Sequence, residues 1–174
     1  ARIACNFGIH GLHVVSDEHH DEERMLKMAT HKAAFLIRDI HYCATTAEAV
    51  APFQLVVGAT ARQGRRRMED HTPREVMAEI APLAAETRIA LMFGSEASGL
   101  TNEDLDSCQY ASTIPTADFA SLNLAQAVAI HAYELYTALH AHPFSGVPKS
   151  DFANSYDLEV PSIPTCPLPC PPHP

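Results

Sequence analysis

A chain of 174 residues has the length of one globular domain, or of one domain with a tail, and is long enough to bury its own core. Hydrophobic residues make up 47% and charged residues 19%, and no apolar run approaches the roughly 20 residues that a membrane span requires. This composition excludes a membrane-spanning protein and, for the bulk of the chain, a disordered one. The net charge of −9 disfavours nucleic-acid binding by the surface as a whole, so any RNA or DNA site has to be a local patch.

Short apolar runs alternate with longer segments of helical periodicity through the first part of the chain. The short runs predict strands at residues 12–15, 55–58, 89–94 and 111–115. The longer segments predict helices at residues 21–38, 72–87 and 121–140, with a short one from Thr101. Strands that alternate with helices predict an α/β fold with a parallel sheet flanked by helices.

A change in composition predicts one domain boundary. Nine of the thirteen prolines lie between Pro143 and Pro174, where large apolar residues become rare. We therefore expect a globular domain over residues 1–142 and a proline-rich tail or linker over residues 143–174. No initiator Met and no helix cap precede Arg2, so we expect the natural chain to begin earlier. Five cysteines without a secretory leader predict a reducing, cytoplasmic location.

The loops that follow the predicted strands are the candidate sites, because ligands of parallel sheets bind beyond the carboxyl ends of the strands. Three such loops are small and polar, at residues 58–62, 94–100 and 119–124. The chain contains no G-x-G-x-x-G after a strand, no G-x-x-x-x-G-K-[ST] and no G-x-S-x-G. These absences argue against a dinucleotide-binding protein, a P-loop NTPase and a serine hydrolase.

Together the loops resemble the motifs of the SpoU/TrmH family of RNA ribose 2′-O-methyltransferases, in the SPOUT superfamily. Residues 93–100, Phe-Gly-Ser-Glu-Ala-Ser-Gly-Leu, resemble the second motif. Ile114-Pro115 with residues 121–128 resembles the third, and Ala1-Arg2 with residues 6–8 resembles the end of the first. The resemblance covers most of residues 1–140. Residues 58–62 and 72–75 are most similar to the TrmJ-type branch, which methylates the tRNA anticodon loop.

The resemblance implies a SPOUT-type fold, in which the C-terminal part of the sheet is threaded through a loop as a trefoil knot. It also implies that S-adenosyl-L-methionine is bound in the knot and that a homodimer shares the active site. The implied partner is RNA, with tRNA first and rRNA as the other candidate. The sequence departs from the family at its start, where the first strand and the Asn-Ile-Gly stretch before the arginine are missing.

The resemblance assigns catalytic roles by position. Arg2 corresponds to the catalytic arginine and is expected to bind an RNA phosphate and to assist removal of the proton from the 2′-hydroxyl. Glu96, Ser121 and Asn123 are expected to hold the arginine and the backbone near the reaction. Judged by residue chemistry alone, Glu96 could equally be a solvated carboxylate of a loop without a catalytic role. Asn123 could equally be the cap at the start of a helix.

The resemblance also implies a set of cofactor-binding residues. Its glycines would let the backbone approach the cofactor, and its apolar side chains would enclose an adenine. Taken one by one, the apolar members also fit an ordinary core. The set is Gly58, Ala59, Thr60, Phe93, Gly94, Ser95, Gly99, Leu100, Ile114, Pro115, Leu122, Leu124 and Ala127.

An arginine-rich segment follows the second predicted strand of this acidic chain. A positive loop at a sheet edge suits phosphate contacts, although an exposed solvated loop explains the same residues. The expected RNA-binding residues are Arg62, Arg65, Arg66, Arg67 and Arg74. The histidines lack the spacing and the fourth partner that zinc requires, so we expect no metal site.

Two other functions stay open. One is an RNA-binding relative that keeps the methyltransferase fold but is catalytically impaired, which the missing first strand favours. The other is a small-molecule-binding α/β domain, for which the arginine-rich segment would be accidental.

Overall fold

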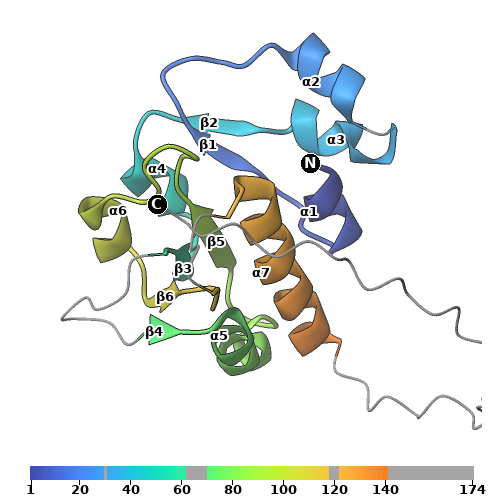
Figure 1. Ribbon diagram of the computed structural model, residues 1–174. Coiled ribbons are helices and arrows are strands. Elements are labelled where there is room, and N and C mark those ends of the chain that lie inside the picture. The colour runs from blue at the N-terminus through green and yellow to red at the C-terminus, as the bar shows by residue number, and fades with distance from the viewer. Residues whose placement is uncertain (30, 62–69, 118–121, 141–174) are drawn as a thin grey trace, which may run out of the picture. The chain divides into compact units, whose positions relative to one another are not determined.

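The computed structural model describes residues 1–29, 31–61, 70–117 and 122–140, and Figure 1 shows the order of their elements. All described residues belong to one compact unit, Ala1–Ala141. The predicted proline-rich tail, residues 143–174, lies outside the described residues and stays a prediction. Within the described ranges, no helix is long and apolar enough to cross a membrane.

The first part of the unit carries a two-stranded parallel sheet. β1, His13–Val15, pairs with β2, His41–Cys43, in the register His13↔His41. The helices of this part are α1, Arg2–Asn6; α2, Glu22–Met28; the 3-10 helix η1, His31–Ala33; α3, Ala34–Arg38; and α4, Thr46–Val50. The prediction of one helix over residues 21–38 is wrong, because α2 ends where Ala29 adopts an extended backbone with φ −85° and ψ 150°.

The second part carries a four-stranded parallel sheet in the order β4-β6-β3-β5. Its strands are β3, Leu55–Ala59; β4, Asp70–His71; β5, Ile89–Phe93; and β6, Tyr110–Ser112. Its helices are α5, Pro73–Ile80; the 3-10 helix η2, Ala81–Leu83; α6, Asn102–Asp106; and α7, Leu124–Leu139. Parallel pairing confirms the α/β prediction, although the described strands form two sheets rather than the single sheet expected. The knot stays an implication of the resemblance.

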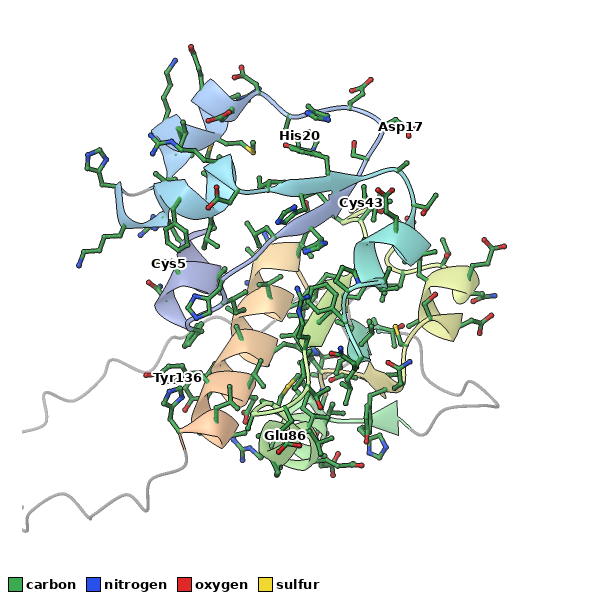
Figure 2. All side chains as sticks on the ribbon, turned by 180° about the vertical axis from the view of Figure 1, so that it is seen from behind. Cys5, Asp17, His20, Cys43, Glu86 and Tyr136 are labelled. Carbon is green, nitrogen blue, oxygen red and sulfur yellow. The ribbon has the colours of Figure 1, made fainter. Side chains whose placement is uncertain are left out.

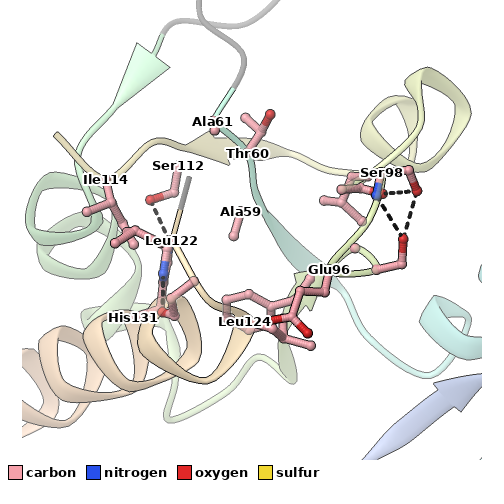
Figure 3. A pocket seen from close by; sticks show the side chains of 16 residues that line it. Ala59, Thr60, Ala61, Glu96, Ser98, Ser112, Ile114, Leu122, Leu124 and His131 are labelled. Atoms are coloured by element: carbon pink, nitrogen blue, oxygen red, sulfur yellow. Dashed lines mark hydrogen bonds between the residues drawn. The ribbon is translucent and has the colours of Figure 1, made fainter. Parts of the chain in front are cut away.

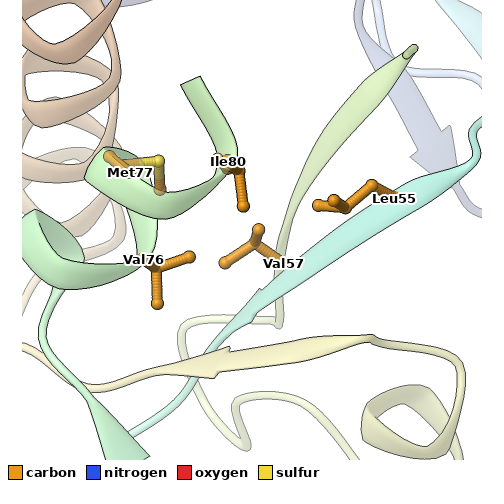
Figure 4. Packing of buried hydrophobic residues seen from close by; sticks show 5 residues of the cluster. All are labelled: Leu55, Val57, Val76, Met77 and Ile80. Atoms are coloured by element: carbon orange, nitrogen blue, oxygen red, sulfur yellow. The ribbon is translucent and has the colours of Figure 1, made fainter. Parts of the chain in front are cut away.

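The alternating side chains of β3 fill two hydrophobic clusters. Leu55 and Val57 pack against three buried residues of α5, namely Val76, Met77 and Ile80 (Figure 4). Val56 belongs to a second cluster, which also contains Leu100, Leu105 and Cys108. Because neighbouring residues of a strand point to opposite faces, β3 is covered on both sides. The carboxyl end of this buried strand is then a rigid base for a site.

The α-helices α5, α6 and α7 of this part each begin with a reciprocal cap. The cap side chain accepts the amide proton of the third helical residue, and that residue's side chain accepts the amide proton of the cap. The pairs are Thr72 with Glu75 in α5, Thr101 with Asp104 in α6, and Asn123 with Gln126 in α7. These caps fix where each helix begins.

Gly58 of β3 lies in the second cluster, where a side chain has no room. A Cβ at this position would lie 2.8 Å from Cys108 Sγ and 2.9 Å from Leu105 Cδ2. Gly58→Ala should therefore lower the free energy of unfolding by about 1–3 kcal/mol, the usual cost of overpacking a core. Chemical denaturation measures this loss. Gly11→Ala is the matched control, because no atom lies within 4 Å of its Cβ, and equal midpoints for the two variants would contradict the crowding.

Candidate functional site

A cavity of about 230 Å³ opens at the carboxyl ends of β3, β5 and β6 (Figure 3). Three segments line it: the end of β3, the loop that follows β5, and the chain from β6 into the first turns of α7. All but two of the residues predicted to bind the cofactor are among the lining residues. They are Ala59, Thr60, Phe93, Gly94, Ser95, Gly99, Leu100, Ile114, Leu122, Leu124 and Ala127.

The two exceptions, Gly58 and Pro115, do not line the cavity. Gly58 precedes Ala59, the first residue of β3 that lines the cavity, and it is enclosed by Leu100, Leu105 and Cys108 of the second cluster. In turn, the cavity has lining residues that the sequence patterns did not single out as cofactor-binding. They are Ala61, Glu96, Ser98, Ser112 and His131, of which only Glu96 had an expected role.

The loop after β5 is folded tightly on itself. A Cβ at Gly94 would lie 1.9 Å from the carbonyl carbon of Gly99 and 2.2 Å from the amide nitrogen of Leu100, so only glycine fits. Gly99 has φ +68°, a left-handed conformation that favours glycine. The Gly99 amide donates to the Ser95 carbonyl at 2.8 Å, and the hydroxyl oxygens of Ser95 and Ser98 lie 2.7 Å apart. The loop thus presents a preformed wall to the cavity.

Asn123 caps α7. Its Oδ1 accepts from the amides of Ala125 at 2.7 Å and Gln126 at 3.4 Å, and the Asn123 amide donates to Gln126 Oε1 at 3.2 Å. This geometry supports the helix-cap interpretation of Asn123, and it anchors the turn that carries Leu122 and Leu124 to the cavity. Ser121, from the same predicted catalytic set, lies outside the described residues.

The structure does not bring Arg2 to the cavity of its own chain. Glu96 lines the cavity with an exposed side chain, whereas Arg2 is exposed at the start of α1 and is not a lining residue. α1 packs on the C-terminal half of α7, where the Phe7 ring lies 6.2 Å from Tyr133 and 6.0 Å from Tyr136, centroid to centroid (Figure 2). Motif one therefore lies against the C-terminal half of α7, whereas the cavity is lined by the N-terminal half of that helix.

A buried polar pair lies beside the cavity. His131 of α7 is 1% exposed and Ser112 of β6 is 0% exposed. His131 Nε2 lies 3.0 Å from Ser112 Oγ, and His131 Nδ1 lies 2.8 Å from the Ala127 carbonyl oxygen (Figure 3). Burial lowers the pKa of His131, and the hydrogen bond to Ala127 opposes this only in part. The spacing of His131 from Leu124 and Ala127 is the sequence signal that could have revealed it, since helical residues four and seven apart share a face.

The predicted RNA-binding residues are represented in the described ranges by Arg74 alone. Arg74 lies on α5 and forms an ion pair with Glu134 of α7, with 3.2 Å between Arg74 Nη2 and Glu134 Oε1. Its side chain is 80% exposed, so the ion pair leaves the guanidinium open to solvent. Arg62, Arg65, Arg66 and Arg67 lie outside the described residues. Over the part of the chain that is described, no group of three His, Cys, Asp or Glu could hold a metal ion.

Comparisons with known proteins bear on the reaction class. The TrmJ enzyme of Escherichia coli strain K12, a tRNA (cytidine/uridine-2′-O-)-methyltransferase, is 36% identical over 139 residues. These residues are 79% of this chain and 56% of that enzyme, so the chain spans a little over half of this relative. A probable methylase family protein from Haemophilus influenzae Rd KW20 has a TM-score of 0.71 at 31% identity, and the match covers 90% of this chain and 65% of that one.

A third relative has a ligand in its structure. The AdoMet-bound rRNA methyltransferase from Sinorhizobium meliloti has a TM-score of 0.61 at 25% identity, and the match covers 79% of this chain and 49% of that chain. Residues 1–133 match the SpoU rRNA Methylase family. That range contains every described segment that lines the cavity. This chain belongs to the SpoU rRNA Methylase family.

Proposed function

We propose that this chain transfers a methyl group from S-adenosylmethionine to a ribose 2′-hydroxyl of RNA, with tRNA as the first substrate to test and rRNA as the second. The observation that carries the proposal is the cavity, on which the end of β3 and the segments of the second and third motifs converge at the carboxyl edge of the sheet. Family membership and the activity of the E. coli relative support the reaction class. The AdoMet-bound relative from S. meliloti supports the cofactor.

The residues of the cavity fit such a cofactor. Ile114, Leu122 and Leu124 offer apolar surface suited to a purine, and the backbone of residues 94–99 offers amides and carbonyls suited to polar groups. Glu96 places a carboxylate in the lining, where it complements a positively charged ligand. When bound, S-adenosylmethionine supplies an activated methyl group on a positively charged sulfur.

Arg2 acts on the RNA in this proposal. Its guanidinium binds the phosphate and stabilises negative charge on the 2′-oxygen, and the proton of the 2′-hydroxyl leaves to solvent water as the methyl group is transferred. Glu96 orients groups in the cavity. The described role of Asn123 is to cap α7, so in this proposal it positions Leu122 and Leu124 and acts on the reaction only through them.

We propose further that the active unit is a homodimer in which Arg2 serves the cavity of the partner subunit. Arg2 is exposed and outside the cavity of its own chain, which supports a composite site. α7 also exposes large side chains: Tyr133 is 52% exposed, Tyr136 40% and Leu139 45%. Such a surface beside α1 suits a two-fold interface that would bring motif one close to a second chain.

The cytoplasm is the proposed location. Cys5, Cys43 and Cys108 are free thiols, and proteins of reducing compartments keep their cysteines in this form. Burial raises the pKa of Cys108 to about 11, so this thiol is an unreactive part of the core.

The arginine-rich segment is proposed to bind the RNA backbone. Replacing Arg65, Arg66 and Arg67 together by alanine should weaken tRNA binding, because fewer phosphates are neutralised and fewer counterions are released. The slope of log Kd against log salt should become shallower by up to about one unit for each phosphate that is no longer neutralised. Filter binding over a salt series measures the slope. An unchanged slope with weaker binding would point to a structural effect instead.

The deciding experiment is a methylation assay with mass spectrometry of the nucleosides. The chain is incubated with S-adenosylmethionine and an unmodified tRNA transcript, and the digested RNA is searched for 2′-O-methylated nucleosides. Their appearance supports the proposal. Binding of both tRNA and S-adenosylhomocysteine without any methylated product would favour the RNA-binding relative that lacks turnover. A folded chain that binds neither molecule would overturn both.

A further inference from the structure

We propose that His131 is the positioning residue that holds β5, β6 and α7 together beside the cavity, and that it does so only as a neutral imidazole. The inference rests on the proposed function, because it concerns the cavity that would take the cofactor. It gives a role to a side chain that none of the motifs described above includes.

His131 contacts one cavity-lining residue of β5, one of β6 and one of its own helix, α7. The Phe93 ring, at the end of β5, meets the imidazole edge to face, with 5.3 Å between ring centroids and an interplanar angle of 87°. Ser112 of β6 lies 3.0 Å from Nε2, and the Ala127 carbonyl of α7 lies 2.8 Å from Nδ1. Phe93, Ser112 and Ala127 all line the cavity. A single buried side chain thus joins β5, β6 and α7 where their residues form the site.

The hydrogen bonds define which ring nitrogen carries the proton of the neutral imidazole. A carbonyl oxygen only accepts, so His131 Nδ1 carries the proton that is donated to Ala127. In the neutral ring Nε2 is then an acceptor, and the Ser112 hydroxyl donates to it. On a second protonation the Ser112 hydroxyl could turn to accept from Nε2, but the ring, which is 1% exposed, would carry a positive charge among Phe93, Ser112 and Ala127, none of which can neutralise it. Burial of the ring therefore favours the neutral form.

In the described part of the elements around His131, the nearby ionisable side chains are either exposed to solvent or bonded to another residue. Glu96 lines the cavity but is exposed, Tyr110 of β6 donates to Glu79, and Glu134 of α7 pairs with Arg74. Burial is the main cause that lowers the pKa of His131 in the folded chain. Because the pKa of His131 is lower in the folded chain than in the unfolded one, its neutral ring contributes to the free energy of unfolding above about pH 6.5. This contribution is lost as the pH falls below that value.

Two substitutions separate the two hydrogen bonds. His131→Gln places an amide oxygen where Nε2 accepts from Ser112 and carries no titratable group. His131→Asn keeps a donor near the Ala127 carbonyl but is too short to reach Ser112. The experiment is calorimetry of S-adenosylhomocysteine binding to the wild-type chain and to both variants over a pH series from about 8 down to about 4.5, because burial lowers the pKa of His131 in the folded chain below the ordinary value of about 6.5. Melting curves check that each variant is folded.

A positioning role for His131 predicts a particular pattern of affinities among the wild type and the variants. Wild-type affinity should fall about five- to tenfold at the acidic end of the series, where the buried ring becomes charged. His131→Gln should bind tightly throughout the series, and His131→Asn and Ser112→Ala should bind about five- to tenfold more weakly throughout. Equal affinities for the Gln and Asn variants, or an acid-induced loss in His131→Gln that matches the wild type, would overturn the proposal. If the wild-type chain binds no S-adenosylhomocysteine at any pH of the series, the proposed function fails instead.

Discussion

Gly94→Ala should abolish binding of S-adenosylhomocysteine while the chain stays folded. The new Cβ would lie 1.9 Å from the carbonyl carbon of Gly99, and a backbone atom cannot rotate away as a flexible side chain can. The loop of residues 94–100 must therefore move, and the cavity loses the wall that this loop forms. We expect the affinity measured by calorimetry to fall about a hundredfold or more, the upper range for an overpacked site.

Gly99→Ala is the matched control in the same loop. No atom lies within 4 Å of a Cβ at Gly99, but φ is +68°, so alanine there costs only about 1–2 kcal/mol of backbone strain. Its affinity should lie between those of the wild type and Gly94→Ala. A folded Gly94→Ala chain that binds as well as the wild type would show that the loop forms no part of the cofactor site.

Arg2→Ala should slow single-turnover methylation by about a hundred- to a thousandfold, roughly 3–4 kcal/mol, because it removes a group that stabilises charge in the transition state. Cofactor affinity and melting temperature should hardly change, since Arg2 is exposed and does not line the cavity. Quench-flow with saturating tRNA measures the rate. Arg24→Ala is the control, because Arg24 is an equally exposed arginine on α2.

A mixed dimer of two inactive variants tests whether the site is composite. An Arg2→Ala chain keeps the cavity, and a Gly94→Ala chain keeps the arginine. If Arg2 serves the partner subunit, each mixed dimer contains one complete site, and random pairing of co-expressed chains should restore about a quarter of wild-type activity. If Arg2 serves its own chain, every site stays defective and the mixture stays inactive. A chain that remains monomeric by light scattering would exclude the composite site.

The sequence predicts the central strands well and the first part of the unit poorly. β3 and β5 are runs of five residues, long enough for an apolar pattern to stand out, and both lie where the sequence places them. β1 and β2 have three residues each, and the apolar pattern does not predict β2 at all. The break between α2 and α3 comes from the extended backbone at Ala29, a residue that ordinarily favours helix.

Within the site, motif spacing predicts which loops meet but not which side chains touch. The pairing of Ser112 with His131 depends on the rotation of α7 against β6, which no local pattern of either segment encodes. Asn123 shows the opposite case, because its cap geometry follows from Gln126 three residues later, whereas the motif suggested chemistry. The separation of Arg2 from the cavity is a property of packing between α1 and α7 and is not readable from spacing.

The three reciprocal helix caps have a consequence for the order of folding. Each cap closes between residues three apart in the sequence, so the caps of α5, α6 and α7 need no strand pairing to form. The sheet contacts are far less local, since the bond from the Val56 amide to the Gln109 side chain spans 53 residues and that from Arg88 to Gln54 spans 34. Bringing such distant segments together is the slow event in parallel sheets. The cavity, which needs three strand ends at once, is therefore among the last features of this chain to form.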